Sequence, residues 1–130
     1  MSIYDTLDVP LTDDERLVLW AGLIEWGGPA RCTEELAVAM GWRDVANLLD
    51  RGSELAAEIK AKKPLTQVDW VRALLATEIV FASDVMGSGG DWSITTGLPD
   101  VETIRHLRSL QRKIPRAGVV GVAFGSREKS

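Results

Sequence analysis

Cysteine and histidine are almost missing from this sequence, which has one cysteine, Cys32, and one histidine, His106, among 130 residues. A single cysteine cannot form an internal disulfide, and zinc sites need several cysteine or histidine ligands at close spacing. The chain also lacks the ligand spacing of a calcium-binding loop. We therefore expect no metal site, and we expect a compartment in which thiols stay reduced.

Long apolar runs and known catalytic motifs are missing as well. The longest apolar candidate, 73–86, is interrupted by Glu78 and Asp84 and is too short to span a membrane. Residues 1–10 have neither the basic nor the apolar part of a signal peptide. No GxGxxG, Walker A or GxSxG pattern occurs. The sequence thus predicts a cytoplasmic protein with no membrane contact and no cofactor.

The overall composition is that of one globular domain, with 45% hydrophobic and 26% charged residues. Its charge is unevenly spread. Residues 1–59 carry 12 acidic and 4 basic side chains, a net charge of −8, and residues 105–130 carry 1 acidic and 7 basic side chains, a net charge of +6. The basic end either folds back on the acidic end, is solvated, or binds an acidic partner or nucleic acid.

Helix signals recur along the first 115 residues. Thr12 and Glu15 have the spacing of a capping box, Thr33 is a second N-cap, and Thr66 with Asp69 forms a third such signal. Glycine and proline divide the rest, and the expected helices cover about 12–26, 33–40, 43–51, 55–62, 66–86 and 99–113, with a break at 52–53. We expect a compact all-α domain of five or six helices over 1–115, an ordered Gly-rich loop, and an extended tail over 116–130.

Glu78 is unusual because it lies on an apolar helix face. Its neighbours three and four residues away are all apolar: Leu74, Leu75, Phe81 and Ala82. A carboxylate there must be paired or protonated. It either pins the following loop through Trp92, the loop amides or a later arginine, or it is a raised-pKa group in a pocket. Asp84, six residues on, is expected to brace the loop instead.

The Gly-rich segment 87–98 is the least regular part of the predicted domain. It holds Trp92, Thr95 and Thr96, and residues 93–96 could form a very short strand. Loops of this type often carry function, although a tryptophan here can equally plug the core. Together with Glu78, these three residues are our candidate ligand-binding set, and we assign no catalytic residue.

The basic C-terminal part supplies the candidate interaction residues. Arg105, Arg108 and Arg112 fall on one helical stripe, and residues 119–124 are β-prone and apolar. The stripe is either solvated, paired with acidic groups of this chain or of a partner, or used for nucleic-acid phosphates. Val120 and Phe124 of the tail are expected to take part in an interface, for which a homodimer is the simplest form.

Residues 33–51 resemble half of a helix-turn-helix motif, with Ala37 and Gly41 at the positions of its small residue and turn glycine. That resemblance implies DNA binding. The second half departs from the motif, because its inward positions fall on Asn47 and Asp50. The charges of that half also cancel, because it holds two basic and two acidic residues: Arg43, Arg51, Asp44 and Asp50. Nucleic acid is therefore an unfavoured partner.

These observations favour a non-enzymatic helical domain for protein–protein interaction or regulation, of adaptor or immunity type. The segregated charge supports this reading, and so do the five tryptophans, which exceed the need of a small core and are common at interfaces. The alternatives are a transcriptional regulator using 33–51 and a small-ligand binder or enzyme with a pocket around Glu78 and Trp92.

Overall fold

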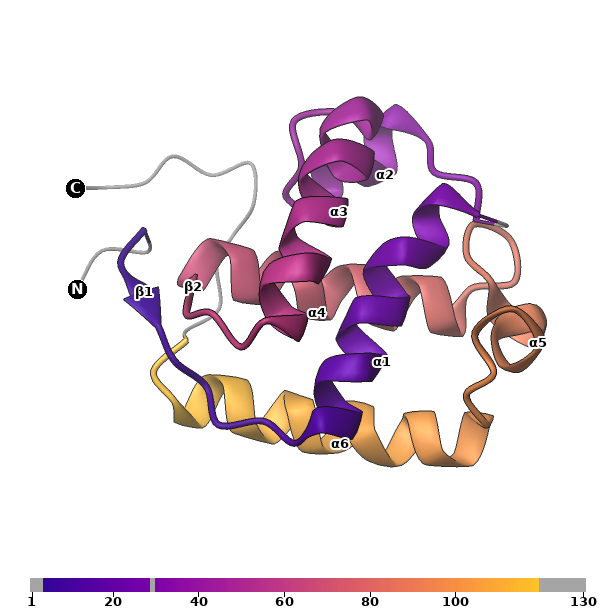
Figure 1. The fold of residues 1–130 in the computed structure, drawn as a ribbon. Coiled ribbons are helices and arrows are strands. Elements are labelled where there is room, and N and C mark those ends of the chain that lie inside the picture. The colour runs from indigo at the N-terminus through magenta and orange to yellow at the C-terminus, as the bar shows by residue number, and fades with distance from the viewer. Residues whose placement is uncertain (1–3, 29, 120–130) are drawn as a thin grey trace.

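The computed structural model describes residues 4–28 and 30–119, whose elements are shown in Figure 1. This part of the chain forms the helices α1 (Asp13–Ile24), α2 (Glu34–Ala39), α3 (Val45–Lys60), α4 (Gln67–Ala82), α5 (Trp92–Thr96) and α6 (Asp100–Arg116). The 3-10 helices η1 (Glu25–Gly27) and η2 (Gly89–Asp91) and the strands β1 (Thr6–Leu7) and β2 (Leu65–Thr66) complete it. The predicted compact all-α fold is confirmed.

Helix α1 is the central element, in contact with α3, α4 and α6 (Figure 1). Its predicted capping box is present: Thr12 Oγ1 accepts the Glu15 N–H at 3.1 Å, and the Glu15 carboxylate accepts the Thr12 N–H at 2.8 Å. Gly22 allows the close approach to α4, since a Cβ at this position would lie 2.2 Å from Thr77 Oγ1. Helix α1 therefore packs closely on α4, and it also contacts α6.

Helix α3 is continuous where the sequence predicted two helices with a break at 52–53. Ser53 stays in the helix and donates its hydroxyl to the Leu49 carbonyl at 2.9 Å. Gly52 is buried within the helix, where a glycine costs about 0.5–1 kcal/mol relative to alanine. Burial of Leu55 and Ile59 outweighs this cost, because both side chains are 0% exposed. The predicted break was therefore wrong.

The N-terminal segment is attached at the start of α4. Strand β1 pairs antiparallel with β2, with Leu7 opposite Leu65, and the Trp70 indole donates from Nε1 to the Leu7 carbonyl at 2.9 Å. Thr66 caps α4 by accepting the Asp69 N–H at 3.1 Å. The Asp69 carboxylate does not complete the expected capping box, because it pairs with arginine side chains instead.

The Gly-rich segment contains the short helix α5, so the predicted strand at 93–96 was wrong. Gly89 adopts a positive φ of 46°, and a Cβ there would lie 2.0 Å from Asp84 Oδ1. The same oxygen accepts the Gly90 N–H at 2.6 Å. Asp84 therefore braces the turn before α5, as the sequence predicted. Position 89 requires glycine because of its positive φ and because a Cβ would clash with Asp84.

Helix α6 passes through Pro115, where we expected it to end, and continues to Arg116. Pro115 removes one helical N–H donor one residue before the end of α6. The chain then turns at Gly118 (φ 110°), and Val119 is buried. The expected boundary between 115 and 116 falls inside the last turn of α6. The remaining tail, with the predicted interaction residues Val120 and Phe124, lies outside the described residues.

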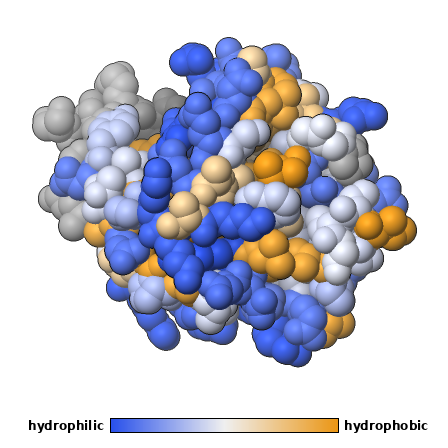
Figure 2. Space-filling model, in the orientation of Figure 1, coloured by the Kyte–Doolittle hydropathy of each residue, from blue (hydrophilic) through white to orange (hydrophobic). Residues whose placement is uncertain are grey.

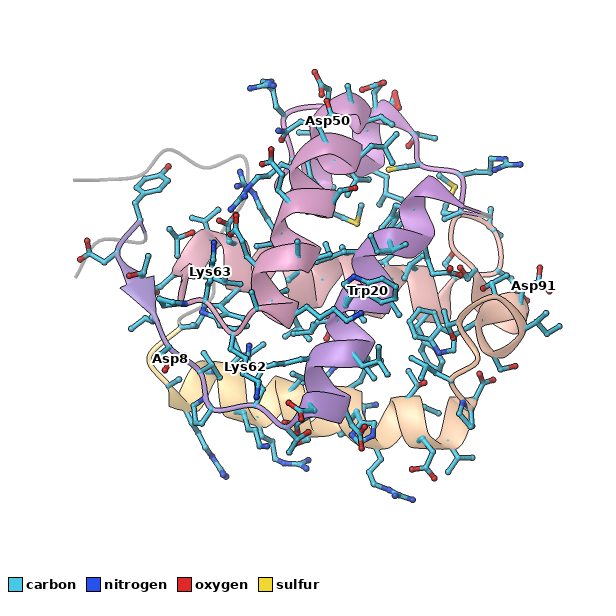
Figure 3. The ribbon with its side chains drawn as sticks, in the orientation of Figure 1. Asp8, Trp20, Asp50, Lys62, Lys63 and Asp91 are labelled. Carbon is cyan, nitrogen blue, oxygen red and sulfur yellow. The ribbon has the colours of Figure 1, made fainter. Side chains whose placement is uncertain are left out.

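Four of the five tryptophans, Trp26, Trp42, Trp70 and Trp92, are at most 4% exposed and belong to the core. Trp20, labelled on α1 in Figure 3, is half-buried with the Lys60 ammonium 4.2 Å from its ring centroid. The inference that surplus tryptophans mark an interface was therefore wrong. Figure 2 shows that the face with α1 and α3 is largely hydrophilic, with separate apolar patches.

Within the described ranges, no helix has both the length and the apolar content needed to cross a membrane.

Candidate functional site

Glu78 lies on α4 and is half-buried, facing α6. Its carboxylate accepts a hydrogen bond from Gln111 Nε2 of α6 at 2.6 Å. Among the described residues this is its one hydrogen-bond partner. The sequence suggested Trp92, the loop amides or an arginine as the partner, and none of these bonds is present in the described part of the chain.

Trp92 belongs to the core and not to a cavity wall. It is 0% exposed, its Nε1 donates to Thr103 Oγ1 at 2.9 Å, and its ring meets Phe81 edge to face with centroids 5.5 Å apart. The Thr96 hydroxyl donates to the Trp92 carbonyl at 2.6 Å, within the same short helix. The Trp92 indole N–H and the Thr96 hydroxyl thus both have partners within the protein, which leaves little hydrogen-bonding capacity for a ligand.

The carboxylate that holds the Gly-rich loop is Glu25 of η1, which is 8% exposed. It accepts the Ser88 hydroxyl at 2.7 Å and the Thr95 hydroxyl through the same oxygen. Sequence reasoning overlooked Glu25, although the signal resembled that of Glu78: a lone acid among apolar residues, here between Ile24 and Trp26. Thr95 is therefore part of a structural contact with Glu25 and shares no hydrogen bond with the Glu78 carboxylate.

The four predicted ligand residues consequently fall in two places. Thr95, Thr96 and Trp92 stabilise the loop around α5, whereas Glu78 lines a surface groove between α4 and α6. We call this feature the α4–α6 groove.

The α4–α6 groove consists of two adjoining hollows of about 200 and 210 Å³. Both are largely apolar, and Glu78 lines both. The first is lined by Glu78, Phe81, Ala82, Ile104, Leu107, Arg108 and Gln111. The second is lined by Val71, Leu74, Leu75, Glu78, Ile114, Pro115 and Val119.

A short polar chain crosses the groove where the hollows meet. Arg108 donates from Nη1 to Gln111 Oε1 at 2.8 Å, and Gln111 in turn donates from Nε2 to Glu78. Both amide ends of Gln111 are therefore satisfied, and the amide is fixed in one orientation. The negative charge on α4 and the positive charge on α6 are linked through a neutral group, not through a direct ion pair.

The arginine stripe predicted on α6 is present and exposed. Arg105 pairs with Glu102 at 3.2 Å, and the Arg105 side chain is 66% exposed. Lys113, by contrast, points inward and donates to the Glu15 carboxylate at 2.7 Å. Burial works against the charged form of Glu15, but hydrogen bonds from Lys113, Ser109 and the Thr12 backbone outweigh it and lower the Glu15 pKa to about 2.

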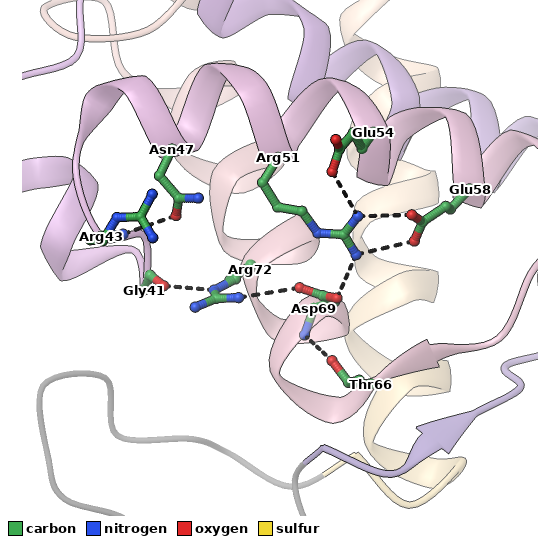
Figure 4. Close-up of polar contacts among 9 residues, drawn as sticks. All are labelled: Gly41, Arg43, Asn47, Arg51, Glu54, Glu58, Thr66, Asp69 and Arg72. Carbon is green, nitrogen blue, oxygen red and sulfur yellow. Dashed lines mark hydrogen bonds and ion pairs between the residues drawn. The ribbon is translucent and has the colours of Figure 1, made fainter.

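The region that resembles a helix-turn-helix motif forms α2 and the first part of α3. Its Arg51 is not free for phosphates, as Figure 4 shows: it pairs with both Glu58 oxygens at 2.8 and 3.1 Å and with Asp69 at 2.9 Å. The hydrogen bonds to Glu58 raise the Arg51 pKa above its ordinary value. Arg43 is the cation of this motif that stays exposed, with Asp44 3.9 Å away, and Asp50 on α3 is exposed as well.

The remaining candidate groups, Cys32 and His106, lie outside the α4–α6 groove. Burial raises the pKa of the Cys32 thiol, so it stays protonated near neutral pH. His106 lines a separate hollow of about 180 Å³ with Asp14 and Glu102. Across residues 4–28 and 30–119, no group of three or more His, Cys, Asp or Glu side chains is placed to hold a metal ion.

No protein-family model matches the chain, and no solved structure matches it.

Proposed function

We propose that this protein is a non-enzymatic interaction domain, which binds an amphipathic helix of a partner protein in the α4–α6 groove. The observation that carries the proposal is the pair of adjoining apolar hollows that share Glu78. Surface hollows lined by apolar side chains of two neighbouring helices are the usual receptors for the apolar face of a third helix.

The spacing of the hollows favours a helical occupant. The α4 residues that line only one hollow, Leu74–Leu75 and Phe81–Ala82, are seven positions apart, which corresponds to about 10 Å of helix rise. A partner helix lying along the groove would place side chains i and i+7 at the same separation. An extended strand repeats on one face every ~7 Å, which fits the two hollows less well.

Exposed apolar side chains continue the groove along α6. Ile104, which lines the first hollow, is 48% exposed, and Val101, one turn earlier, is 70% exposed. Contiguous exposed apolar side chains at a hollow are a common property of protein-binding surfaces. The partner helix would cover them and remove their apolar area from water.

A fluorescent peptide of alanine and glutamine tests the proposal, with leucines spaced i, i+4, i+7 and i+11. We expect saturable binding in fluorescence anisotropy. Ile104→Asp should weaken it about tenfold or more, since a charge would be placed at the apolar contact. Ile94→Asp is the matched control, because Ile94 is 80% exposed on α5 and lines neither hollow.

Two results would overturn this function. One is equal binding of a peptide with the same leucines distributed around the helix. The other is unchanged affinity in Ile104→Asp, with circular dichroism showing that the variant is folded.

The sequence suggested a homodimer formed through the tail, and a second copy of the chain is the alternative occupant of the groove. Light scattering distinguishes the two occupants. A monomer at micromolar concentration agrees with a separate partner protein, whereas a dimer that Ile104→Asp converts to a monomer replaces that partner by a second copy. We also propose a cytoplasmic location, because the lone cysteine, Cys32, suits a compartment in which thiols stay reduced.

A further inference from the structure

The α6 side of the groove carries a row of arginines. Arg105, Arg108, Arg112 and Arg116 follow one another at spacings of three and four residues, so they share one helical face. All four are exposed, and Arg108 itself lines the first hollow. We call this row the arginine rim. Its arginines are next to the groove-lining positions Ile104, Gln111 and Pro115 in the sequence, so the rim borders the groove along α6.

The arginine rim is only weakly neutralised within the protein. Arg105 has an exposed ion pair with Glu102, and Arg108 bonds to the neutral Gln111 amide. For Arg112 and Arg116, no acidic group of the described residues lies within ion-pair distance. The rim is therefore positively charged, although the chain as a whole has a net charge of −4.

The α4 side of the groove provides no matching cations. Arg72, the one arginine of α4, donates to the Gly41 carbonyl at 2.6 Å and to Asp69 at 3.3 Å, and it lies over the Trp42 ring. The charged group that α4 contributes to the groove is Glu78. The groove thus has a basic α6 edge and a single carboxylate at its centre.

We infer, on the basis of the proposed function, that the partner helix is acidic along the edge that faces α6. Its apolar side chains would occupy the hollows, and Asp or Glu residues would pair with Arg108, Arg112 and Arg116. It would also place a hydrogen-bond donor opposite Glu78, because a carboxylate covered by a helix needs further donors to replace water. Rim charges of this kind set orientation and association rate more than the final affinity.

Three versions of the leucine peptide test the charge of the partner: glutamine, glutamate or lysine at the positions beside the leucines. We expect the glutamate version to bind about tenfold more tightly than the lysine version at low salt, with the glutamine version between them. The difference should shrink strongly at about 0.5 M salt, because exposed charges are screened there.

The double variant Arg108→Glu/Arg112→Glu should reverse the order, so that the lysine version binds best. Arg43→Glu is the matched control, since the Arg43 side chain is 79% exposed and lies before α3, away from the groove. The control should keep the original order.

The outcomes separate this inference from the proposed function. If all three peptides bind equally and require Ile104, the acidic partner is refuted and the groove function stands. If none binds, the groove function itself fails. If generic duplex DNA competes as well as the glutamate peptide and its binding is insensitive to Ile104→Asp, the rim is a polyanion site, and the inference is overturned.

Discussion

Gln111 donates a hydrogen bond to the Glu78 carboxylate at 2.6 Å, and this bond joins α6 to α4 where the two hollows of the groove meet. The bond lets an acidic side chain remain on an otherwise apolar face without a direct cationic partner. It also sets the polarity of the groove floor: a negative centre, with arginine on the α6 side.

Replacing Gln111 by glutamate tests this arrangement. Gln111→Glu would place two carboxylates in contact, so we expect the free energy of unfolding at pH 7 to fall by about 1–2 kcal/mol. The loss should shrink below about pH 4, where a carboxyl group takes up a proton. Urea titrations at both pH values measure it. Gln111→Met, which removes the hydrogen bond without adding charge, should cost less and show little pH dependence; equal losses in the two variants would contradict the account.

Glu25, for which the sequence predicted no role, should contribute to the stability of the fold. Glu25→Ala leaves the Ser88 hydroxyl without its acceptor and leaves the Thr95 hydroxyl only the Asp91 carbonyl, at 3.2 Å. We expect a loss of about 1–3 kcal/mol, measured by urea unfolding. Glu35→Ala, at an exposed position of α2, should change stability by less than about 0.5 kcal/mol. A Glu25→Ala protein as stable as this control would show that the loop is held by other contacts.

The contrast between Glu25 and Glu78 illustrates what the sequence could predict about the site. Both acids stand among apolar residues, and this pattern correctly indicates restricted exposure. It does not indicate the partner, because the partner lies on a distant segment: Ser88 and Thr95 for one acid, Gln111 for the other. Partner identity depends on how the helices pack, which local spacing does not specify.

The helix caps could be predicted because, unlike the partners of Glu25 and Glu78, their bonds join residues that are close in the sequence. The bonds between Thr12 and Glu15 are local, three residues apart, and formed as expected. Asp69 had the same local signal, but its carboxylate pairs with Arg51, which is eighteen positions away in the sequence. Gly52 likewise suggested a break that packing of the neighbouring apolar residues prevented. Tertiary contacts overrode the local preference at both positions.

The pH dependence of stability should report on Glu15. Its folded-state pKa is about 2, against an ordinary value of 4.5, so the ionised form stabilises the native state. This stabilisation is fully present above about pH 4.5 and is lost as the pH falls towards 2. Glu15→Gln should therefore be less stable than the parent at pH 7, by at most about 3 kcal/mol, and this difference should shrink between pH 4.5 and 2.

Chemical denaturation of both proteins at several pH values measures this difference. Asp50→Asn, at an exposed position of α3, is the control and should show no comparable change. A Glu15→Gln difference that stays constant down to pH 2 would mean that Glu15 stabilises the protein by shape and not by charge.

The contact between α1 and α4 should be sensitive to a single methyl group. Gly22→Ala would put a Cβ 2.2 Å from Thr77 Oγ1, so α1 must shift, and we expect a cost of about 1–3 kcal/mol in thermal or urea unfolding. Adding Thr77→Ala should recover part of this loss. Gly27→Ala is the matched control, because nothing lies within 4 Å of a Cβ at that position. Equal effects of the two glycine substitutions would contradict close packing at Gly22.

The central claim is that the α4–α6 groove is the binding surface, and an NMR titration tests it most directly. The glutamate version of the leucine peptide is added to the isotopically labelled full chain, and the backbone amide shifts are followed. The account predicts saturable shifts concentrated in residues 71–82 and 104–116, with little change in residues 34–60 of α2 and α3. Shifts centred on α2 and α3, or none at saturating peptide, would contradict it.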